Sequence, residues 1–165
     1  MLEVDVTLMQ GSFRLDARFA AEAPIVALFG RSGAGKSTLV NAIAGLVKPQ
    51  RGRIAVGGRT LFDEKAGIDL APERRRVGYV FQDALLFPHL TVRANLAYGE
   101  RLTPPAERYV EHDRIVELLD LKRLLDRRPS RLSGGERQRA AIESATARSE
   151  SRRTWSSWPG VCVNE

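Results

Sequence analysis

Hydrophobic and polar residues alternate along the first nineteen positions of the chain. Leu2, Val4 and Val6 are separated by polar residues, and the apolar positions between 13 and 19 alternate in the same way. A period of two predicts strands with one buried face. Residues 25–29 form an unbroken apolar run instead, which is typical of a strand buried on both faces. We therefore predict two half-buried strands followed by a fully buried one.

The pattern then changes to helical spacing. A helix is predicted to begin near Lys36 and to end at Gly45 and Pro49, which are common stop signals. Its apolar positions are Leu39, Val40, Ile43 and Leu46. Residues 53–56 and 77–81 are predicted to be short strands, and residues 91–125 are predicted to be helical. The apolar face of that second helical region is Ile115, Leu118, Leu119 and Leu121.

Composition indicates a soluble globular protein. Apolar residues make up 43% of the 165 residues and charged residues 28%, which suffices for one domain with a core. No run approaches the roughly 20 apolar residues that span a bilayer. The acidic, alternating N-terminus does not resemble a signal peptide. The single cysteine, Cys162, excludes an internal disulfide and fits a reducing compartment.

The net charge of +6 requires nucleic acid to be considered as a partner. The basic residues are scattered, however, and no RNA-binding aromatic motif or metal-finger spacing accompanies them. A solvated surface or an anionic membrane face explains the charge equally well. We therefore expect no nucleic-acid partner.

Residues 30–38, GRSGAGKST, match the phosphate-binding pattern G-x-x-x-x-G-K-[ST]. Glycines let backbone N–H groups surround phosphate oxygens, and the helix that follows adds its positive dipole end. Lys36 would neutralise the β- and γ-phosphates, Ser37 would ligate Mg²⁺, and Thr38 would lie near the α-phosphate. The predicted ATP-binding residues are Gly30, Arg31, Ser32, Gly33, Ala34, Gly35, Lys36, Ser37 and Thr38.

A second motif, LSGGERQR at residues 132–139, follows about a hundred residues later. The Ser133 hydroxyl and the N–H groups of Gly134 and Gly135 would open a helix as a further anion site. A phosphate loop followed by this motif resembles the ABC ATPase family, over residues 1–142. The resemblance implies a head-to-tail dimer in which Ser133, Gly134, Gly135 and Gln138 close over the ATP of the second subunit.

Two further residues gain a role from the resemblance. Gln82, at the end of the predicted strand 77–81, resembles the family's Q-loop glutamine, which implies contact with Mg²⁺ and the attacking water. The segment after it resembles the part that faces a membrane permease subunit. Phe13 resembles the family's adenine-stacking aromatic, although an aromatic on an alternating strand can equally be a core residue.

Within the family, the chain is most similar to ATP-binding subunits of molybdate importers. The similar stretches are GRSGAGKSTLVNAIAGL, PQRGRIAVGGRTLFD, RRRVGYVFQDALLFPHLTVRANLAYG and LLDRRPSRLSGGERQR. The resemblance implies a peripheral subunit on the cytoplasmic face of the inner membrane. None of these residues would touch molybdate, so sulfate, phosphate, iron and polyamine importers stay open.

The expected fold class is α/β, a P-loop NTPase core with an N-terminal antiparallel β region and a helical subdomain, incomplete at the C-terminus. Residues 1–142 would form a partial ATP-binding domain, and residues 143–165 an aberrant tail. Within the domain, residues 1–24 would be the β region, 25–85 the P-loop core, and 86–142 the helical subdomain with the signature.

The chain departs from the family after the signature. No aspartate follows Asp126, and both histidines, His89 and His112, precede the signature. The Walker B aspartate, the water-polarising glutamate and the switch histidine are therefore absent, and we expect no ATP hydrolysis. A frameshift near Ile142 or a natural divergent tail would explain this. Non-hydrolytic nucleotide binding and an inactive decayed product are the alternatives. We also expect the tail to be poorly ordered and residues 25–29 to expose an apolar edge.

Overall fold

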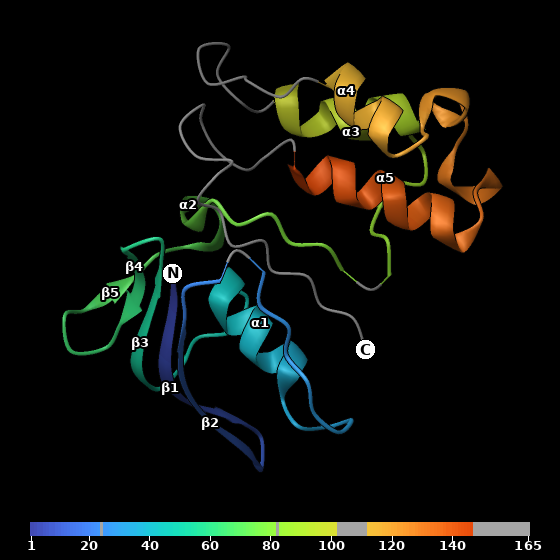
Figure 1. Cartoon of the computed structure of the whole chain (residues 1–165). Coiled ribbons are helices and arrows are strands. Elements are labelled where there is room, and N and C mark those ends of the chain that lie inside the picture. Colours follow the sequence, from blue (N-terminus) through green and yellow to red (C-terminus); the bar gives the residue numbers. More distant parts are fainter. Residues whose placement is uncertain (24, 82, 102–111, 147–165) are drawn as a thin grey trace. The chain divides into compact units, whose positions relative to one another are not determined.

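The computed structural model describes residues 1–23, 25–81, 83–101 and 112–146 (Figure 1). The chain divides into two compact units, the first of residues 1–77 and the second beginning at Gly78. Each unit is described by itself. Gln82 and residues 147–165 lie outside the described residues, and with them the predicted catalytic glutamine and most of the predicted tail.

The first unit is built on a five-stranded antiparallel sheet in the order β2-β1-β3-β4-β5. The strands are β1 (Leu2–Gln10), β2 (Phe13–Ala21), β3 (Arg51–Val56), β4 (Arg59–Asp63) and β5 (Ile68–Asp69). The two N-terminal strands and the strand at 53–56 are confirmed. Leu2, Val4, Val6 and Leu8 are all buried, because alternate residues of β1 point to the same face.

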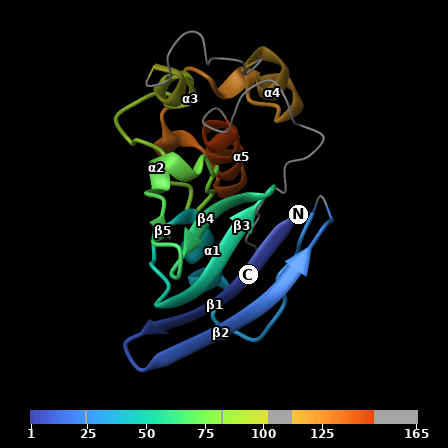
Figure 2. The same ribbon diagram turned by 90° about the vertical axis from the view of Figure 1, so that its left-hand side faces the viewer.

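Helix α1 (Lys36–Ala44) covers one face of this sheet (Figures 1 and 2). Leu39 and Ile43 pack on the buried side chains of β1, β3 and β4, among them Phe62. Each large side chain fully buried there contributes roughly 1.5–3 kcal/mol. The helix ends as predicted, at Gly45, which has a left-handed φ of 85°. Leu46 lies beyond this end and is 49% exposed, so its assignment to the apolar face was wrong.

Arg75, in the short helix α2 (Pro72–Arg75), closes the C-terminal end of α1. Its guanidinium donates to the Ala42 carbonyl at 2.7 Å and the Ile43 carbonyl at 3.1 Å. It also donates to the Leu70 carbonyl at 2.7 Å and pairs with Asp69 at 3.1 Å. Burial lowers the pKa of Arg75, and the charge of Asp69 opposes this effect. A buried cation thus satisfies carbonyls that the last turn of a helix leaves without partners.

Two predicted strands are absent. Residues 25–29 contain one isolated bridge residue, Ile25, and residues 77–81 form no regular element. Ile25 is 81% exposed and Phe29 is 93% exposed, so the prediction of a strand buried on both faces was wrong. The expected exposure of apolar surface in this segment is confirmed. An apolar run becomes a buried strand only where other strands flank it, and no described strand pairs along residues 26–29.

The second unit is helical. It contains α3 (Val92–Arg101), α4 (His112–Leu118), α5 (Gly134–Thr146) and two 3₁₀ turns, η2 (Lys122–Leu124) and η3 (Pro129–Arg131). Its core consists of Val92, Leu96, Leu121, Leu124, Leu132 and Ala140. The helical character predicted for residues 91–125 is confirmed in α3 and α4, while residues 102–111 lie outside the described part.

One residue of the predicted apolar face was misplaced. Leu121 is buried and Leu119 packs beside the core, but Leu118 is 81% exposed because it is the last residue of α4 and projects away from that core. Across the described ranges, no helix combines the length and the apolar character that a membrane crossing requires.

Candidate functional site

The phosphate loop leads from residues 25–29 into α1. The backbone turns at residues 31–34, where the Ala34 N–H donates to the Arg31 carbonyl at 3.1 Å. Gly33 and Gly35 have φ values of 79° and 90°, a conformation that side-chain-bearing residues rarely adopt. The predicted binding residues Arg31, Ser32 and Ala34 are exposed on this turn. The sequence therefore forms an exposed, glycine-shaped loop at the start of a helix.

The N-terminus of α1 is open. The first intrahelical hydrogen bond runs from the Leu39 N–H to the Gly35 carbonyl at 2.9 Å. The N–H groups of Lys36, Ser37 and Thr38 consequently precede the helical ladder. Gly35 offers no side-chain cap, and the first turn carries no acidic residue. These N–H groups and the positive end of the helix dipole face outward as an anion-binding surface.

The Lys36 ammonium stays within the loop. It donates to the Gly30 carbonyl at 3.0 Å and to the Arg31 carbonyl at 3.2 Å. Both contacts are to neutral acceptors, so a phosphate oxygen would offer the ammonium a stronger, charge-assisted partner. Lys36 is therefore placed at the loop with its charge uncompensated by any carboxylate in the described residues.

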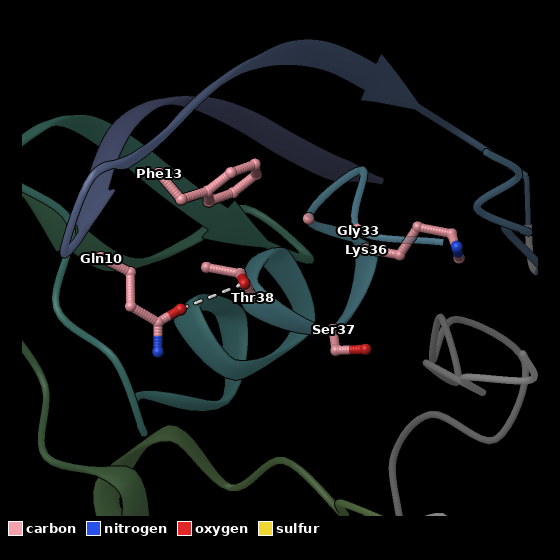
Figure 3. A pocket seen from close by; sticks show the side chains of 7 residues that line it. Gln10, Phe13, Gly33, Lys36, Ser37 and Thr38 are labelled. Carbon is pink, nitrogen blue, oxygen red and sulfur yellow. Dashed lines mark hydrogen bonds between the residues drawn. The ribbon is translucent and has the colours of Figure 1, made fainter. Parts of the chain in front are cut away.

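A pocket of about 280 Å³ opens at this helix end (Figure 3). Its lining residues are Gln10, Phe13, Gly33, Gly35, Lys36, Ser37 and Thr38. A Cβ added at Gly35 would lie 3.0 Å from Phe13 Cζ and 3.1 Å from Leu15 Cδ1, so glycine permits the aromatic ring to approach the loop. The structure thus brings Phe13 together with the phosphate loop, at the opposite end of the pocket from the Lys36 ammonium (Figure 3).

Gln10 also lines this pocket, and the sequence analysis missed it. It is paired directly with Phe13 across the two-residue turn at Gly11 and Ser12. Directly opposed residues of an antiparallel pair project from the same face of the hairpin. The signal was available in the sequence, since Gly11 marks a tight turn between the two predicted strands. The register that places Gln10 opposite Phe13 became known only from the structure.

The signature residues open α5 in the second unit. The Ser133 N–H donates to Glu136 Oε2 at 2.7 Å, and the Glu136 N–H donates to Ser133 Oγ at 3.3 Å. This reciprocal pair is a capping box. The predicted helix start at Ser133, Gly134 and Gly135 is confirmed, and Gln138 follows one turn later, partly exposed.

The charge of Glu136 is stabilised at this position. The hydrogen bonds from Ser133 lower the pKa of Glu136, and Arg127 and Arg123 add a smaller effect of the same sign. Helix α5 continues to Thr146 and buries Glu143, so the first residues assigned to the tail belong to this helix. In the described part of the chain, no three His, Cys, Asp or Glu side chains gather as a metal site.

Comparison with known proteins identifies relatives. The family model described as ABC transporter matches residues 19–151. Among curated proteins, the chain is 56% identical over 145 residues to a molybdenum import ATP-binding protein ModC of Paramagnetospirillum magneticum. It is 59% identical over 145 residues to the ModC protein of Rhodospirillum rubrum. Each match covers 88% of this chain, which spans only about two fifths of the relatives' length (40% and 39%).

Solved structures give the same result. One is described as the ATP-binding subunit of an ABC transporter, with a TM-score of 0.68 and 29% identity, covering 87% of this chain and 60% of that one. Another is a dimeric, post-hydrolysis state of the ATP-binding cassette MJ0796 bound to ADP and Pi, with a TM-score of 0.67 and 26% identity, covering 90% of this chain and 70% of that one. The α/β class is thereby confirmed, and the chain belongs to the ABC transporter family, in its ATP-binding subunits.

Proposed function

We propose that this chain binds ATP with Mg²⁺ through the loop at residues 30–38, as the ATP-binding part of an ABC importer. The observation that carries the proposal is the pocket at the open N-terminus of α1, lined by Lys36, Ser37 and Thr38. Backbone N–H groups of the loop and the Lys36 ammonium bind the phosphates, and Phe13 stacks on the base.

The residues around this pocket fit Mg²⁺ bound together with the nucleotide. The Ser37 hydroxyl is exposed and lines the pocket on the phosphate side, and a hydroxyl oxygen is a ligand that Mg²⁺ accepts. Mg²⁺ held there neutralises charge on the β- and γ-phosphates. The remaining ligands come from the phosphates and water, since Mg²⁺ usually keeps several waters. Gln82 is proposed as the second protein contact, by resemblance alone.

The transported substrate and the partners belong to this proposal. The names of the relatives support molybdenum, as molybdate, and hence a permease partner at the cytoplasmic face of the inner membrane. The dimeric state of the cassette MJ0796 supports a head-to-tail pair, in which Ser133, Gly134, Gly135 and Gln138 of one copy meet the nucleotide of the other. Other oxyanion and polyamine importers share the same ATP-binding chemistry and differ only outside these residues.

We further propose that the 165-residue chain binds ATP without turning it over. No aspartate follows Asp126, so the segment after the signature supplies no carboxylate of the kind that holds Mg²⁺ in this family. Positioning and charge neutralisation carry phosphoryl transfer, and half of that machinery is missing here. The chain would act as a nucleotide-binding module.

The test compares Lys36→Ala with Lys65→Ala, an exposed lysine that lies outside the pocket. Calorimetric titration with ATP and Mg²⁺ should show a loss of at least about tenfold in affinity for Lys36→Ala and no change for Lys65→Ala. Equal affinity in all three proteins would refute nucleotide binding by this loop. Phosphate release by the unmodified chain should match that of Lys36→Ala, and faster Mg²⁺-dependent release would refute the absence of turnover.

A further inference from the structure

The hairpin end of the pocket carries a polar side chain beside its aromatic one. Gln10 is the last residue of β1 and Phe13 the first of β2, and they are paired across the turn. Both line the pocket (Figure 3). The phosphate-binding side chains Lys36 and Ser37 lie at the other end, so the hairpin end would face the nucleoside of a nucleotide whose phosphates occupy the loop.

The position of Gln10 is fixed by its neighbours. The side chain of Gln50 accepts from the Met9 N–H at 2.6 Å, and the Gln50 N–H donates to the Thr7 carbonyl at 3.0 Å. Thr7 Oγ1 in turn donates to Asp16 Oδ1 on β2 at 2.7 Å. The end of β1 is thus held to both of its neighbours immediately before Gln10, and the side chain departs from an anchored backbone.

The carboxamide of Gln10 is only partly used by the protein. Thr38 Oγ1 donates to Gln10 Oε1 at 3.4 Å, which is long for a hydroxyl donor and therefore weak. Figure 3 shows the amide nitrogen directed away from Thr38. Within the described part of the chain, Gln10 Nε2 donates to no protein acceptor. A donor and a replaceable acceptor are therefore available at the pocket's edge.

We propose that Gln10 is a positioning residue that hydrogen-bonds the nucleoside part of the bound nucleotide, at a ribose hydroxyl or at the edge of the base stacked on Phe13. This inference rests on the proposed function, since it assumes that phosphates occupy the loop. Phe13 supplies a flat apolar surface that accepts any base, whereas the carboxamide supplies direction. Together they fix the rotation of the nucleoside relative to the phosphates.

The test compares two ligands, ATP and inorganic tripolyphosphate, on the 165-residue chain and its Gln10→Leu variant, both with Mg²⁺. Leucine keeps the size of glutamine and removes both hydrogen-bonding atoms. We expect ATP affinity to fall about 3- to 10-fold, the effect of one hydrogen bond, and tripolyphosphate affinity to stay unchanged. Equal ATP affinity, or an equal loss for tripolyphosphate, would overturn the inference.

Analogues then identify the group that Gln10 contacts. If the contact is to a ribose hydroxyl, Gln10→Leu loses its effect with 2′-deoxy-ATP or 3′-deoxy-ATP. If it is to the base edge, the effect is lost with GTP instead. A Thr38→Val variant provides the control for action through Thr38, because it should weaken tripolyphosphate as well as ATP. Lys36→Ala separates the two hypotheses: if it leaves ATP binding intact, the proposed function fails, and if only Gln10→Leu is silent, this inference alone fails.

Discussion

The two helices that begin with the phosphate loop and with the signature start in different ways. Helix α1 begins at a left-handed glycine, with no side-chain cap and no acidic residue in its first turn. Helix α5 begins with Ser133 and Glu136 bonded to each other's backbone N–H groups. Both sequences are rich in glycine and small residues, yet only α1 presents free N–H groups and a cation to an incoming anion.

The difference teaches that one kind of sequence can give an open or a closed helix end. At α1 the stability that a cap would provide is absent, which is a cost of about 0.5–2 kcal/mol relative to a capped helix. The opposite end of α1 offsets this through Arg75. At α5 the first turn is satisfied internally, so an anion arriving there meets a carboxylate that already holds the Ser133 N–H.

Replacing Arg75 should have the largest effect, because it removes the support of the open helix. In Arg75→Ala the carbonyls of Ala42 and Ile43 lose a buried charged donor. We expect the free energy of unfolding to fall by about 3 kcal/mol. Urea unfolding followed by circular dichroism measures the change. Arg74→Ala is the matched control, since Arg74 is exposed on the same short helix and its loss should change stability by less than about 0.5 kcal/mol.

If Arg75→Ala and Arg74→Ala unfold at the same urea concentration, α1 does not depend on its C-terminal closure. ATP should partly restore the stability of Arg75→Ala, because a ligand that binds only the folded state stabilises it by mass action. Restoration should be lost in the double variant with Lys36→Ala. That result would connect the two ends of α1 in one experiment.

Local pattern was sufficient to predict the elements that carry their own partners. The alternation in residues 1–19 gave β1 and β2, and the phosphate-loop pattern gave the start of α1. Residues 25–29 are as apolar as any strand, but burial depends on flanking strands that periodicity cannot report. Leu118 fitted the helical period and still lies exposed at a helix end.

The missed residues share one property, which is that their roles depend on tertiary register. Gln10 and Phe13 become neighbours through a hairpin pairing, and Arg75 meets Ala42 across 33 positions of sequence. A run of three arginines, residues 74–76, looked like solvated surface. Only the packing of α2 beside the end of α1 distinguishes the buried Arg75 from its exposed neighbours.

Ser133→Ala should have an intermediate effect and would sharpen the comparison from the capped side. The variant removes the acceptor of the Glu136 N–H, so the helical unit should lose about 1 kcal/mol of stability. Ser130→Ala, an exposed serine in η3, is the control and should change little. Thermal unfolding monitored by circular dichroism compares the two. Equal melting of both variants would mean that the cap seen at α5 contributes nothing measurable.

The smallest effect is expected for Glu136→Gln, which keeps the shape of the cap and removes its charge. The hydrogen bonds from Ser133 lower the pKa of Glu136 in the folded chain, so the folded state favours the carboxylate more than the unfolded state does. This contribution is fully present above the unfolded pKa, near 4.3, and is lost as the pH falls through the lower folded value. Glu136→Gln should therefore be slightly less stable than the unmodified chain at pH 7, and the two should converge below about pH 4. Glu117→Gln, an exposed acid outside any cap, provides the reference for removing one negative charge. Parallel pH profiles for Glu136→Gln and the unmodified chain would show that the carboxylate does not stabilise this helix start, and that α5 is as open to an incoming anion as α1.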